Sequence, residues 1–445
     1  MDRKTHMIMK LSKKIAILGI LSLFISVTSG CDRDIPLDFQ ASDFQQQLKN
    51  TGFNISSTSG QIIIKRKKGI NSFNSISPDF KTIKSIKNLN VEVVQVKNSG
   101  SMDNILKNLR NHPGVEYASP NFIRKIVLPK RRRSTMLAVT PINQGTPAST
   151  AGSDPMRKDQ YALDITHAEQ GWKITRGKAN IIIAIVDTGI DPEHPDLKGK
   201  TVPGFSAIKE SQTVKDENGH GTHVSGIASA ITNNAVGISG MAPNCKIMPV
   251  KVLDHSGSGD DAGIIEGITW AADHGADIIS MSLGGGGTSE AFEEAISYAL
   301  KKNVVIIAAM GNDGQNIENY PAASKGVIAV GSTDAKDKIS DFSNFGNWIT
   351  VSAPGTQILS TFPTYKVDLN NEGLPQNYAT LDGTSMAAPY VAGLAALIRS
   401  KYGKISPEQV KNIIIKGADD LGHPGFDDYF GHGRINVLKT ISNNR

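Results

Sequence analysis

The sequence has little cysteine, few aromatic residues and no apolar run long enough for a comfortable membrane span. Its 445 residues include two cysteines, Cys31 and Cys245, and 6% aromatic residues. Two cysteines exclude a disulfide framework of the kind that holds small secreted domains together. The apolar run at residues 15–27 is shorter than the roughly 20 residues that a transmembrane helix needs. The chain must therefore bury its core without cross-links, and its length allows more than one domain.

The formal net charge is +6, but most of the chain has no excess of positive charge. Residues 1–133 contain 23 Lys and Arg against 9 Asp and Glu, whereas residues 134–445 contain 25 against 33. This asymmetry argues against a uniformly basic nucleic-acid-binding protein, and we expect no nucleic-acid partner. It indicates a basic N-terminal part that can lie on an acidic C-terminal part.

A serine between a Gly-Thr pair and several small residues precedes a long apolar stretch. The sequence Gly-Thr-Ser-Met-Ala-Ala-Pro occupies residues 383–389, and apolar residues follow at 390–398. The pattern predicts a tight turn into a buried helix, with Ser385 in its first turn. Free backbone N–H groups and the helix dipole favour negative charge there, which suits a nucleophile that forms an oxyanion. For this segment alone, a serine N-cap is the simpler alternative.

Two other segments supply an acid and a histidine. The apolar run 181–186 ends in Asp-Thr-Gly at 187–189, as expected for a buried parallel strand with an acid at its carboxyl end. Residues 218–226 read Asn-Gly-His-Gly-Thr-His-Val-Ser-Gly and place His220 and His223 at the start of a helical stretch. A base beside a hydroxyl, oriented by a carboxylate, is the arrangement that makes serine nucleophilic.

Taken in this order, the three segments closely resemble the signatures of the subtilisin-like serine proteases. The chain order Asp, His, Ser is that of subtilisin. The resemblance covers residues 154–445 and implies a catalytic triad of Asp187, His220 and Ser385. It places the base at the first histidine, so that His223 is structural. A metal on the two histidines is the alternative, but the segment has no His-Glu-x-x-His pattern and no evident third ligand.

The same resemblance implies a set of binding residues around the triad. Asn312, after the apolar run 304–309, would donate its side-chain amide to the oxyanion beside the Ser385 N–H; alone it would be a turn residue. The predicted walls for an extended substrate are Gly257, Ser258 and Gly259 on one side and Ser282, Leu283 and Gly284 on the other. Glycines there let one backbone approach another, although loop glycines are common. Asp313 and Asn319 resemble the lining of a polar primary specificity pocket.

A structural calcium ion is the cofactor that the resemblance implies. The predicted calcium ligands are Asp154, Asp196, Thr232, Asn234, Val236 and Ile238. Carboxylates, an asparagine side chain and backbone carbonyls supply the oxygen atoms that calcium takes. The alternative is a surface aspartate beside a plain turn.

The N-terminal third predicts export and a propeptide. Residues 1–30 combine a basic start, a short apolar run and small residues, as in a secretory signal peptide. Cys31 after Ser-Gly resembles a bacterial lipoprotein cleavage site, although Thr28 stands where leucine is usual. A lipid on Cys31 would anchor the protein to a membrane or cell surface; a plain signal peptide is the alternative. Residues 31–60 are expected to form a polar tether.

Residues 61–127 are predicted to form a small α+β domain, with strands at 61–67, 91–96 and 114–121 and an amphipathic helix at 102–111. This domain resembles the ferredoxin-like inhibitory propeptide of the same family; an unrelated adaptor module is the alternative. Residues 128–152 contain a basic run followed by Ser, Thr, Pro and Gly, and are expected to be a linker where maturation cleavage occurs.

Residues 153–445 are expected to form the peptidase domain, a three-layer α/β/α fold with a mostly parallel sheet. Apolar runs at 181–186, 247–253, 278–283, 304–309 and 327–330 alternate with helical stretches at 262–274 and 290–302, which is typical of such a sheet. We expect a monomeric endopeptidase that cuts proteins or peptides and is inhibited by its own propeptide. A catalytically silent surface lipoprotein is one alternative. An aspartic protease is another, but the chain has no second Asp-Thr-Gly or Asp-Ser-Gly.

Overall fold

The computed structural model describes residues 57–69, 80–97, 101–126, 128–129, 153–208 and 213–442. The chain divides into a unit of residues 1–54 and a unit of residues 55–445, and only the second contains described residues. The predicted signal peptide, Cys31 and most of the predicted tether and linker lie outside the described residues. Within the described ranges, no helix has the length and apolar character needed to cross a membrane.

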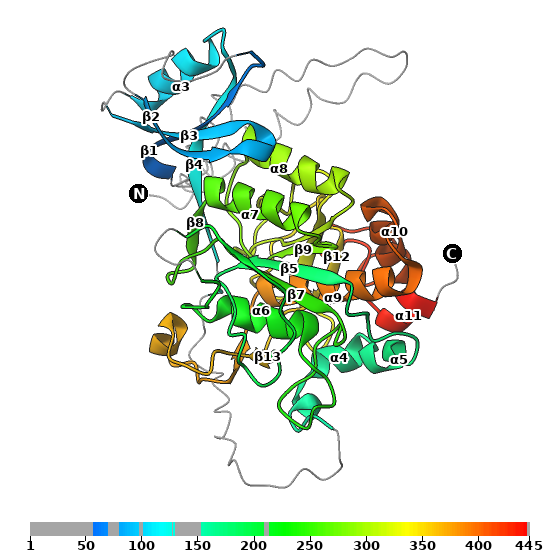
Figure 1. The fold of residues 1–445 in the computed structure, drawn as a ribbon. Coiled ribbons are helices and arrows are strands. Elements are labelled where there is room, and N and C mark those ends of the chain that lie inside the picture. Colours follow the sequence, from blue (N-terminus) through cyan, green and yellow to red (C-terminus); the bar gives the residue numbers. More distant parts are fainter. Residues whose placement is uncertain are drawn as a thin grey trace, which may run out of the picture. The chain divides into compact units, whose positions relative to one another are not determined.

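A seven-stranded parallel sheet forms the centre of the larger domain (Figure 1). The strand order is β12-β11-β10-β9-β5-β7-β6, and every neighbouring pair is parallel. The strands are β5 (Ile182–Asp187), β6 (Phe205–Ser206), β7 (Lys246–Lys251), β9 (Ile278–Met281), β10 (Val305–Ala309), β11 (Ile328–Thr333) and β12 (Val351–Pro354). Apolar runs, as in β5 and β10, form inner strands because both faces of the sheet are buried there, whereas the short edge strand β6 is only half-buried. The predicted mostly parallel sheet is confirmed.

Helices cover both faces of this sheet (Figure 1). On one face lie α7 (Asp261–Asp273) and α8 (Glu290–Lys301), and on the other lie α6 (His220–Ser229) and α9 (Thr384–Tyr402). Side chains alternate along β5 between the apolar clusters of the two faces, as the pleat of a strand requires. The remaining elements are η4 (Arg157–Asp159), α4 (Tyr161–Ile165), α5 (Ala168–Trp172), β8 (Ser258–Asp260), β13 (Ile358–Thr361), η5 (Asp368–Glu372), β14 (Tyr378–Leu381), α10 (Pro407–Gly417) and α11 (Val437–Ser442).

A smaller antiparallel sheet precedes this domain. Its strands are β1 (Ser57–Arg66), β2 (Phe80–Ile86), β3 (Val91–Val96) and β4 (Val115–Lys125), in the order β2-β3-β1-β4. The same small domain contains the short helix η3 (Lys87–Leu89) and the helix α3 (Met102–Arg110). Ile62 and Ile64 pack with α3 on one face, and Ile63 points to the other. The predicted strands and helix are present. The sequence did not predict β2, because this edge strand is mostly polar, and β1 begins within the predicted tether.

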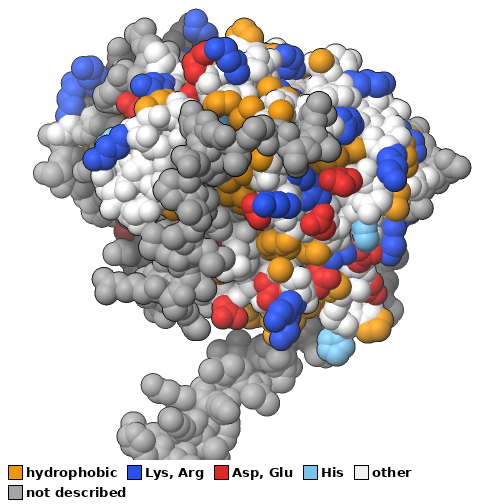
Figure 2. All heavy atoms as spheres, turned by 90° about the horizontal axis from the view of Figure 1, so that it is seen from below, with side chains coloured by type: hydrophobic (Ala, Val, Ile, Leu, Met, Phe, Trp, Pro, Cys, Tyr) orange, Lys and Arg blue, Asp and Glu red, His pale blue; other side chains and the backbone are white. Residues whose placement is uncertain are grey.

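The smaller sheet packs on α7 and α8 of the larger domain. Ile63 and neighbouring apolar residues of β3 join the same apolar cluster as the two helices. Around this contact, Lys65 pairs with Glu294 and Lys84 with Glu266. The contacts follow the charge asymmetry of the sequence, because basic side chains of the small domain meet acidic side chains of the large one. On the face drawn in Figure 2, basic and acidic side chains are interspersed among apolar ones.

Candidate active site

Asp187 and His220 form a buried pair at the carboxyl end of the central strand. Asp187 is the last residue of β5, and His220 is the first residue of α6. His220 Nδ1 lies 2.8 Å from Asp187 Oδ1, and both side chains are buried. The Thr188 N–H donates to the same carboxylate oxygen at 2.7 Å. Since Asp187 accepts only, this geometry places the proton of a neutral imidazole on Nδ1 and leaves Nε2 as an acceptor.

Small residues of both motifs allow this approach. A Cβ added to Gly221 would lie 2.1 Å from the Gly189 carbonyl oxygen, so only glycine lets α6 reach the turn after Asp187. Thr188 Oγ1 accepts from the Gly221 N–H at 2.8 Å and donates to Asp216 at 2.9 Å. Asp216, which was not among the residues predicted for the site, is fully buried and also accepts from the Thr222 N–H at 2.8 Å. The sequence feature that could have indicated Asp216 is a carboxylate four residues before His220, just before a predicted helix, where carboxylates accept from backbone N–H groups.

Ser385 and Asn312 meet at the amino end of α9. Ser385 is the second residue of that helix, where backbone N–H groups lack helical acceptors. Asn312 Oδ1 accepts from the Thr384 N–H at 2.8 Å and from Thr384 Oγ1 at 3.0 Å, which orients its amide nitrogen. That nitrogen lies 3.4 Å from the position of a Cβ built on Gly383. The structure thus brings the predicted amide donor to the helix end that carries the predicted nucleophile.

The Ser385 hydroxyl donates to the Ser282 carbonyl at 3.2 Å in this structure. Ser282 Oγ in turn donates to the Ser385 carbonyl at 2.9 Å. Within the described residues, His220 Nε2 has no hydrogen-bond partner. Ser385 Oγ and His220 Nε2 are therefore not hydrogen-bonded to each other in this structure, which is compatible with a pair whose hydrogen bond forms only with substrate.

A strand of the small domain lies between the two predicted substrate walls. Lys125 exchanges hydrogen bonds with Gly284 at 3.2 and 3.1 Å on one side, and the Ile126 N–H donates to Gly257 at 2.9 Å on the other. The end of β4 pairs with β8, with Arg124 opposite Gly259 and Lys125 opposite Ser258. Extended main chain is thus added to the edges of the cleft, which is β-augmentation. Five of the six predicted wall residues, all except Leu283, have main-chain or side-chain contacts with this strand or with Ser385.

Two of the predicted roles for individual residues need refinement. A Cβ on Gly257 would lie 2.4 Å from Ile126, so this glycine does make room for the strand. A Cβ on Gly284 would instead lie 2.2 Å from Asn319, a residue of the predicted specificity pocket. Leu283 belongs to the apolar cluster that also contains Ile279, Met281 and, at its edge, Ile126 of the small domain, and its place in the wall stays a prediction.

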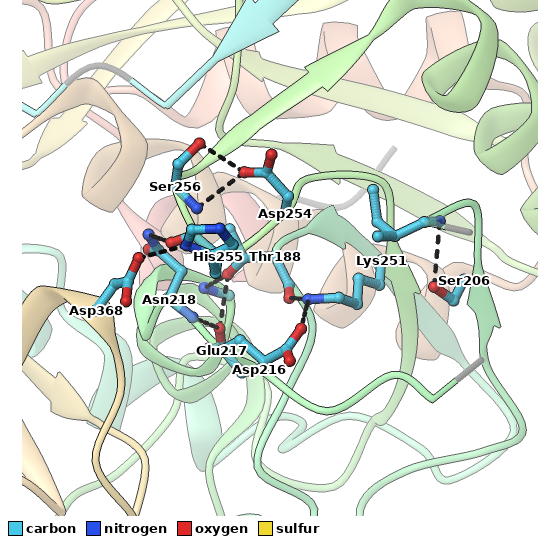
Figure 3. Close-up of polar contacts among 12 residues, drawn as sticks. Thr188, Ser206, Asp216, Glu217, Asn218, Lys251, Asp254, His255, Ser256 and Asp368 are labelled. Atoms are coloured by element: carbon cyan, nitrogen blue, oxygen red, sulfur yellow. Dashed lines mark hydrogen bonds and ion pairs between the residues drawn. The ribbon is translucent and has the colours of Figure 1, made fainter. Parts of the chain in front are cut away.

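Polar side chains fix the loop that leads into the Gly257 wall (Figure 3). Asp254 Oδ1 accepts from the N–H groups of Ser256 at 2.8 Å and Ser258 at 3.0 Å. Asn218, two residues before His220, donates to the His255 carbonyl at 2.7 Å, and His255 pairs with Asp368 at 2.6 Å. These contacts tie the wall to the segment that carries His220.

The predicted calcium residues lie together around the loop between α6 and β7. Asp154 accepts from the N–H groups of Asn233 at 2.9 Å and Asn234 at 3.0 Å. Asn234 Nδ2 donates to Asp196 at 2.8 Å, and the Ile238 N–H donates to Asp196 at 2.9 Å. Burial raises the pKa of Asp196 to about 6, and the charge of Asp154 adds to the shift.

These residues fit a hard cation. Two buried carboxylates face one loop, and the buried Thr232 hydroxyl has no hydrogen-bond partner among the described residues. Carboxylate, amide, hydroxyl and carbonyl oxygens are the donors that calcium prefers. Within the described ranges no cluster of three or more His, Cys, Asp or Glu side chains could hold a metal. Any ion at this loop would therefore depend on amide and main-chain oxygens.

The fold and the site define a hydrolase of the serine type, built on a three-layer α/β/α fold with a parallel sheet, that carries its own N-terminal domain in its cleft. Residues 178–433 match the model of the subtilase family, and residues 54–121 match that of the fervidolysin N-terminal prodomain. The chain belongs to the subtilase family, and it is a serine protease made with a propeptide. The alternatives of a silent lipoprotein and of an aspartic protease are thereby disfavoured.

Relatives with established names agree. The chain is 38% identical to a thermophilic serine proteinase of Bacillus sp. (strain AK1) over 343 residues, which cover 77% of each protein. It is 44% identical to thermitase of Thermoactinomyces vulgaris over 282 residues, or 63% of this chain and 95% of thermitase. The crystal structure of fervidolysin from Fervidobacterium pennivorans superposes with a TM-score of 0.74 at 27% identity, covering 88% of this chain and 62% of that one.

Proposed function

We propose that this protein is an exported serine endopeptidase in which Asp187, His220 and Ser385 hydrolyse peptide bonds. The observation that carries the proposal is the position of residues 123–126 between the two cleft walls, next to the Asp187–His220 pair and the Ser385 helix. A peptide bound in the same extended form would lead its main chain past Ser385.

The proposed chemistry follows from the proton on His220 Nδ1. His220 Nε2 takes the proton of the Ser385 hydroxyl as Ser385 Oγ attacks the peptide carbonyl carbon. The Ser385 N–H and the Asn312 amide donate to the resulting oxyanion, while Asp187 stabilises the imidazolium. His220 then gives the proton to the leaving amine, and an acyl-enzyme remains. Water, deprotonated by His220, releases the acyl group and restores Ser385.

The small domain would keep the precursor latent, because its strand occupies the place of a substrate. A Cβ built on Gly383 would lie 3.6 Å from Pro129 Cδ, beside the same helix that carries Ser385. Ile126 binds the Gly257 wall and Pro129 lies beside Gly383, so we propose that the first maturation cut falls between Ile126 and Pro129, at the start of the predicted linker. Residue 127 lies outside the described residues.

Asp154, Asp196 and the loop 232–238 would hold a structural calcium ion. Their donor chemistry and the Thr232 hydroxyl, which has no hydrogen-bond partner in the part of the chain that the structure describes, support this assignment. The ion would neutralise two buried carboxylates. Export follows from the signal-like residues 1–30, with Cys31 as the proposed lipid attachment site.

The decisive experiment compares the chain from residue 32 onward with its Ser385→Ala variant. A fluorophosphonate probe should label the parent and leave the variant unlabelled, and only the parent should shorten with time and digest casein. Ser225→Ala is a matched control, because the buried Ser225 hydroxyl of α6 has no hydrogen-bond partner among the described residues and should be dispensable. A Ser385→Ala protein that digests casein at the parental rate would refute the assignment.

A further inference from the structure

A buried arginine of the small domain occupies a pocket in which the larger domain supplies every hydrogen-bond acceptor. Arg124, on β4, is 1% exposed, although arginine is almost never fully buried without a partner. Its Nε donates to Asp261 Oδ1 at 2.6 Å, and its NH2 group donates to Asp261 Oδ2 at 3.1 Å. Asp261, the first residue of α7, is itself fully buried. This bidentate pair fixes the guanidinium in position and orientation.

Further contacts match the remaining faces of the guanidinium. Its NH1 group donates to the carbonyls of Gly285 at 3.2 Å and Gly287 at 2.8 Å. Its carbon atom lies 5.0 Å from the centre of the Phe292 ring. Four of the five N–H donors of arginine thus have acceptors, and an aromatic face covers the group. A lysine would offer one point charge and could not make this planar set of contacts.

The pocket opens on the path that a substrate would take. Arg124 lies in the strand that pairs with Gly259, directly before Lys125 and Ile126, which bind the two cleft walls. All the acceptors come from α7 and from the segment between β9 and α8, so the pocket persists when the small domain leaves. The small domain therefore shows how the cleft would bind a substrate side chain that lies a few residues before the scissile peptide bond.

We propose that Asp261 is a specificity-determining residue, which makes this protease select peptides with arginine at the position of Arg124. The inference rests on the proposed function, since it assumes that substrates follow the path of residues 123–126. A neutral side chain of the same shape would leave the Asp261 carboxylate desolvated and without its counter-charge. A site built to hydrogen-bond a group discriminates strongly against analogues that lack it.

The test uses quenched fluorescent peptides with the sequence of residues 120–132, cut by the self-processed enzyme. Arginine at the position of Arg124 is replaced by citrulline, lysine or leucine. We expect kcat/KM for the arginine peptide to exceed that for the citrulline peptide by about 10²-fold or more. Citrulline or leucine at the position of Lys125, whose side chain is exposed, should change kcat/KM only a few-fold. Mass spectrometry of the products locates the cut.

Asp261→Asn provides a second test, because it should lower the ratio of kcat/KM for the arginine peptide to kcat/KM for the citrulline peptide towards one. The peptide series on the parent enzyme tests the proposal even if this variant fails to fold. Equal cleavage of all four peptides would overturn the role of Asp261 and leave the protease assignment intact. If no peptide were cut and the probe did not label Ser385, the proposed function would fail, and the inference with it.

Discussion

Removing the Arg124 side chain should open the precursor. In the closed form, Arg124→Ala leaves Asp261 buried with no counter-charge, because Arg124 and Asp261 are 1% and 0% exposed. Breaking a buried ion pair on one side costs roughly 3–5 kcal/mol. In the open form, in which the strand of the small domain has left the cleft, water solvates Asp261. Most of this free-energy cost therefore destabilises the closed form, in which the strand is bound. At about 1.4 kcal/mol for each factor of ten, the open fraction should rise roughly 10²- to 10³-fold.

A fluorophosphonate probe measures this fraction, since it reaches Ser385 only when the strand has left the cleft. The initial labelling rate of freshly purified protein, summed over precursor and processed bands, should rise in the same proportion. Lys125→Ala is the matched control, because it keeps the main-chain hydrogen bonds with Gly284 and removes only an exposed side chain. The reasoning would be wrong if Arg124→Ala were labelled no faster than Lys125→Ala.

The defect of Arg124→Ala should also depend on pH. Burial raises the pKa of Asp261, and Arg124 opposes that rise. Without Arg124, the closed form binds a proton to Asp261 more tightly than the open form does. Proton binding therefore favours closure at low pH, and this contribution is lost as the pH rises through the raised pKa. Labelling of Arg124→Ala should accelerate with pH more steeply than labelling of the Lys125→Ala control.

Three further predictions concern the rest of the molecule. Asn312→Ala should lower kcat by about 10²–10³-fold with little change in KM, the loss measured for the corresponding donor in subtilisin. Calcium at 100 times its dissociation constant should stabilise the inactive Ser385→Ala protein by about 2.7 kcal/mol, and Asp196→Asn should abolish this response in thermal unfolding. Burial lowers the pKa of Lys200 from 10.5 to about 8, so the fold should gain up to about 3 kcal/mol between those pH values. Lys200→Met, also in the Ser385→Ala background, should remove that rise with pH; an unchanged rise would contradict the assignment.

The large sheet and the catalytic segments could be predicted from the sequence because local patterns determine them. The unbroken apolar runs of β5 and β10 have no alternation, which already indicates strands buried on both faces. The small residues around His220 are needed for the close approach of α6 to the turn after Asp187, so they mark that approach in the sequence. These features depend on the few residues next to them in the chain.

Features that depend on docking could not be predicted in the same way. The polar β2 is a strand only because β3 pairs with it, and its sequence has little apolar alternation. Arg124 sits in an ordinary basic segment of the sequence, and Asp261 is one of two aspartates at a helix start. Their pairing spans two domains, and it becomes visible only when the register of β4 against β8 is known.

The register of β4 against β8 places the buried Arg124–Asp261 ion pair in the substrate cleft, which gives the pair a use beyond stability. An apolar side chain in an apolar pocket could stabilise the closed precursor equally well, since buried ion pairs rarely exceed hydrophobic packing in stability. An apolar pocket would, however, accept many substrates once the propeptide had left. Because Asp261 contacts the propeptide and would contact the substrate, latency and selectivity are coupled. The double variant Arg124→Met/Asp261→Leu should therefore regain slow probe labelling and, after maturation, prefer the leucine peptide over the arginine peptide. If the double variant were labelled slowly but still preferred the arginine peptide, the proposed coupling of latency and selectivity would be wrong.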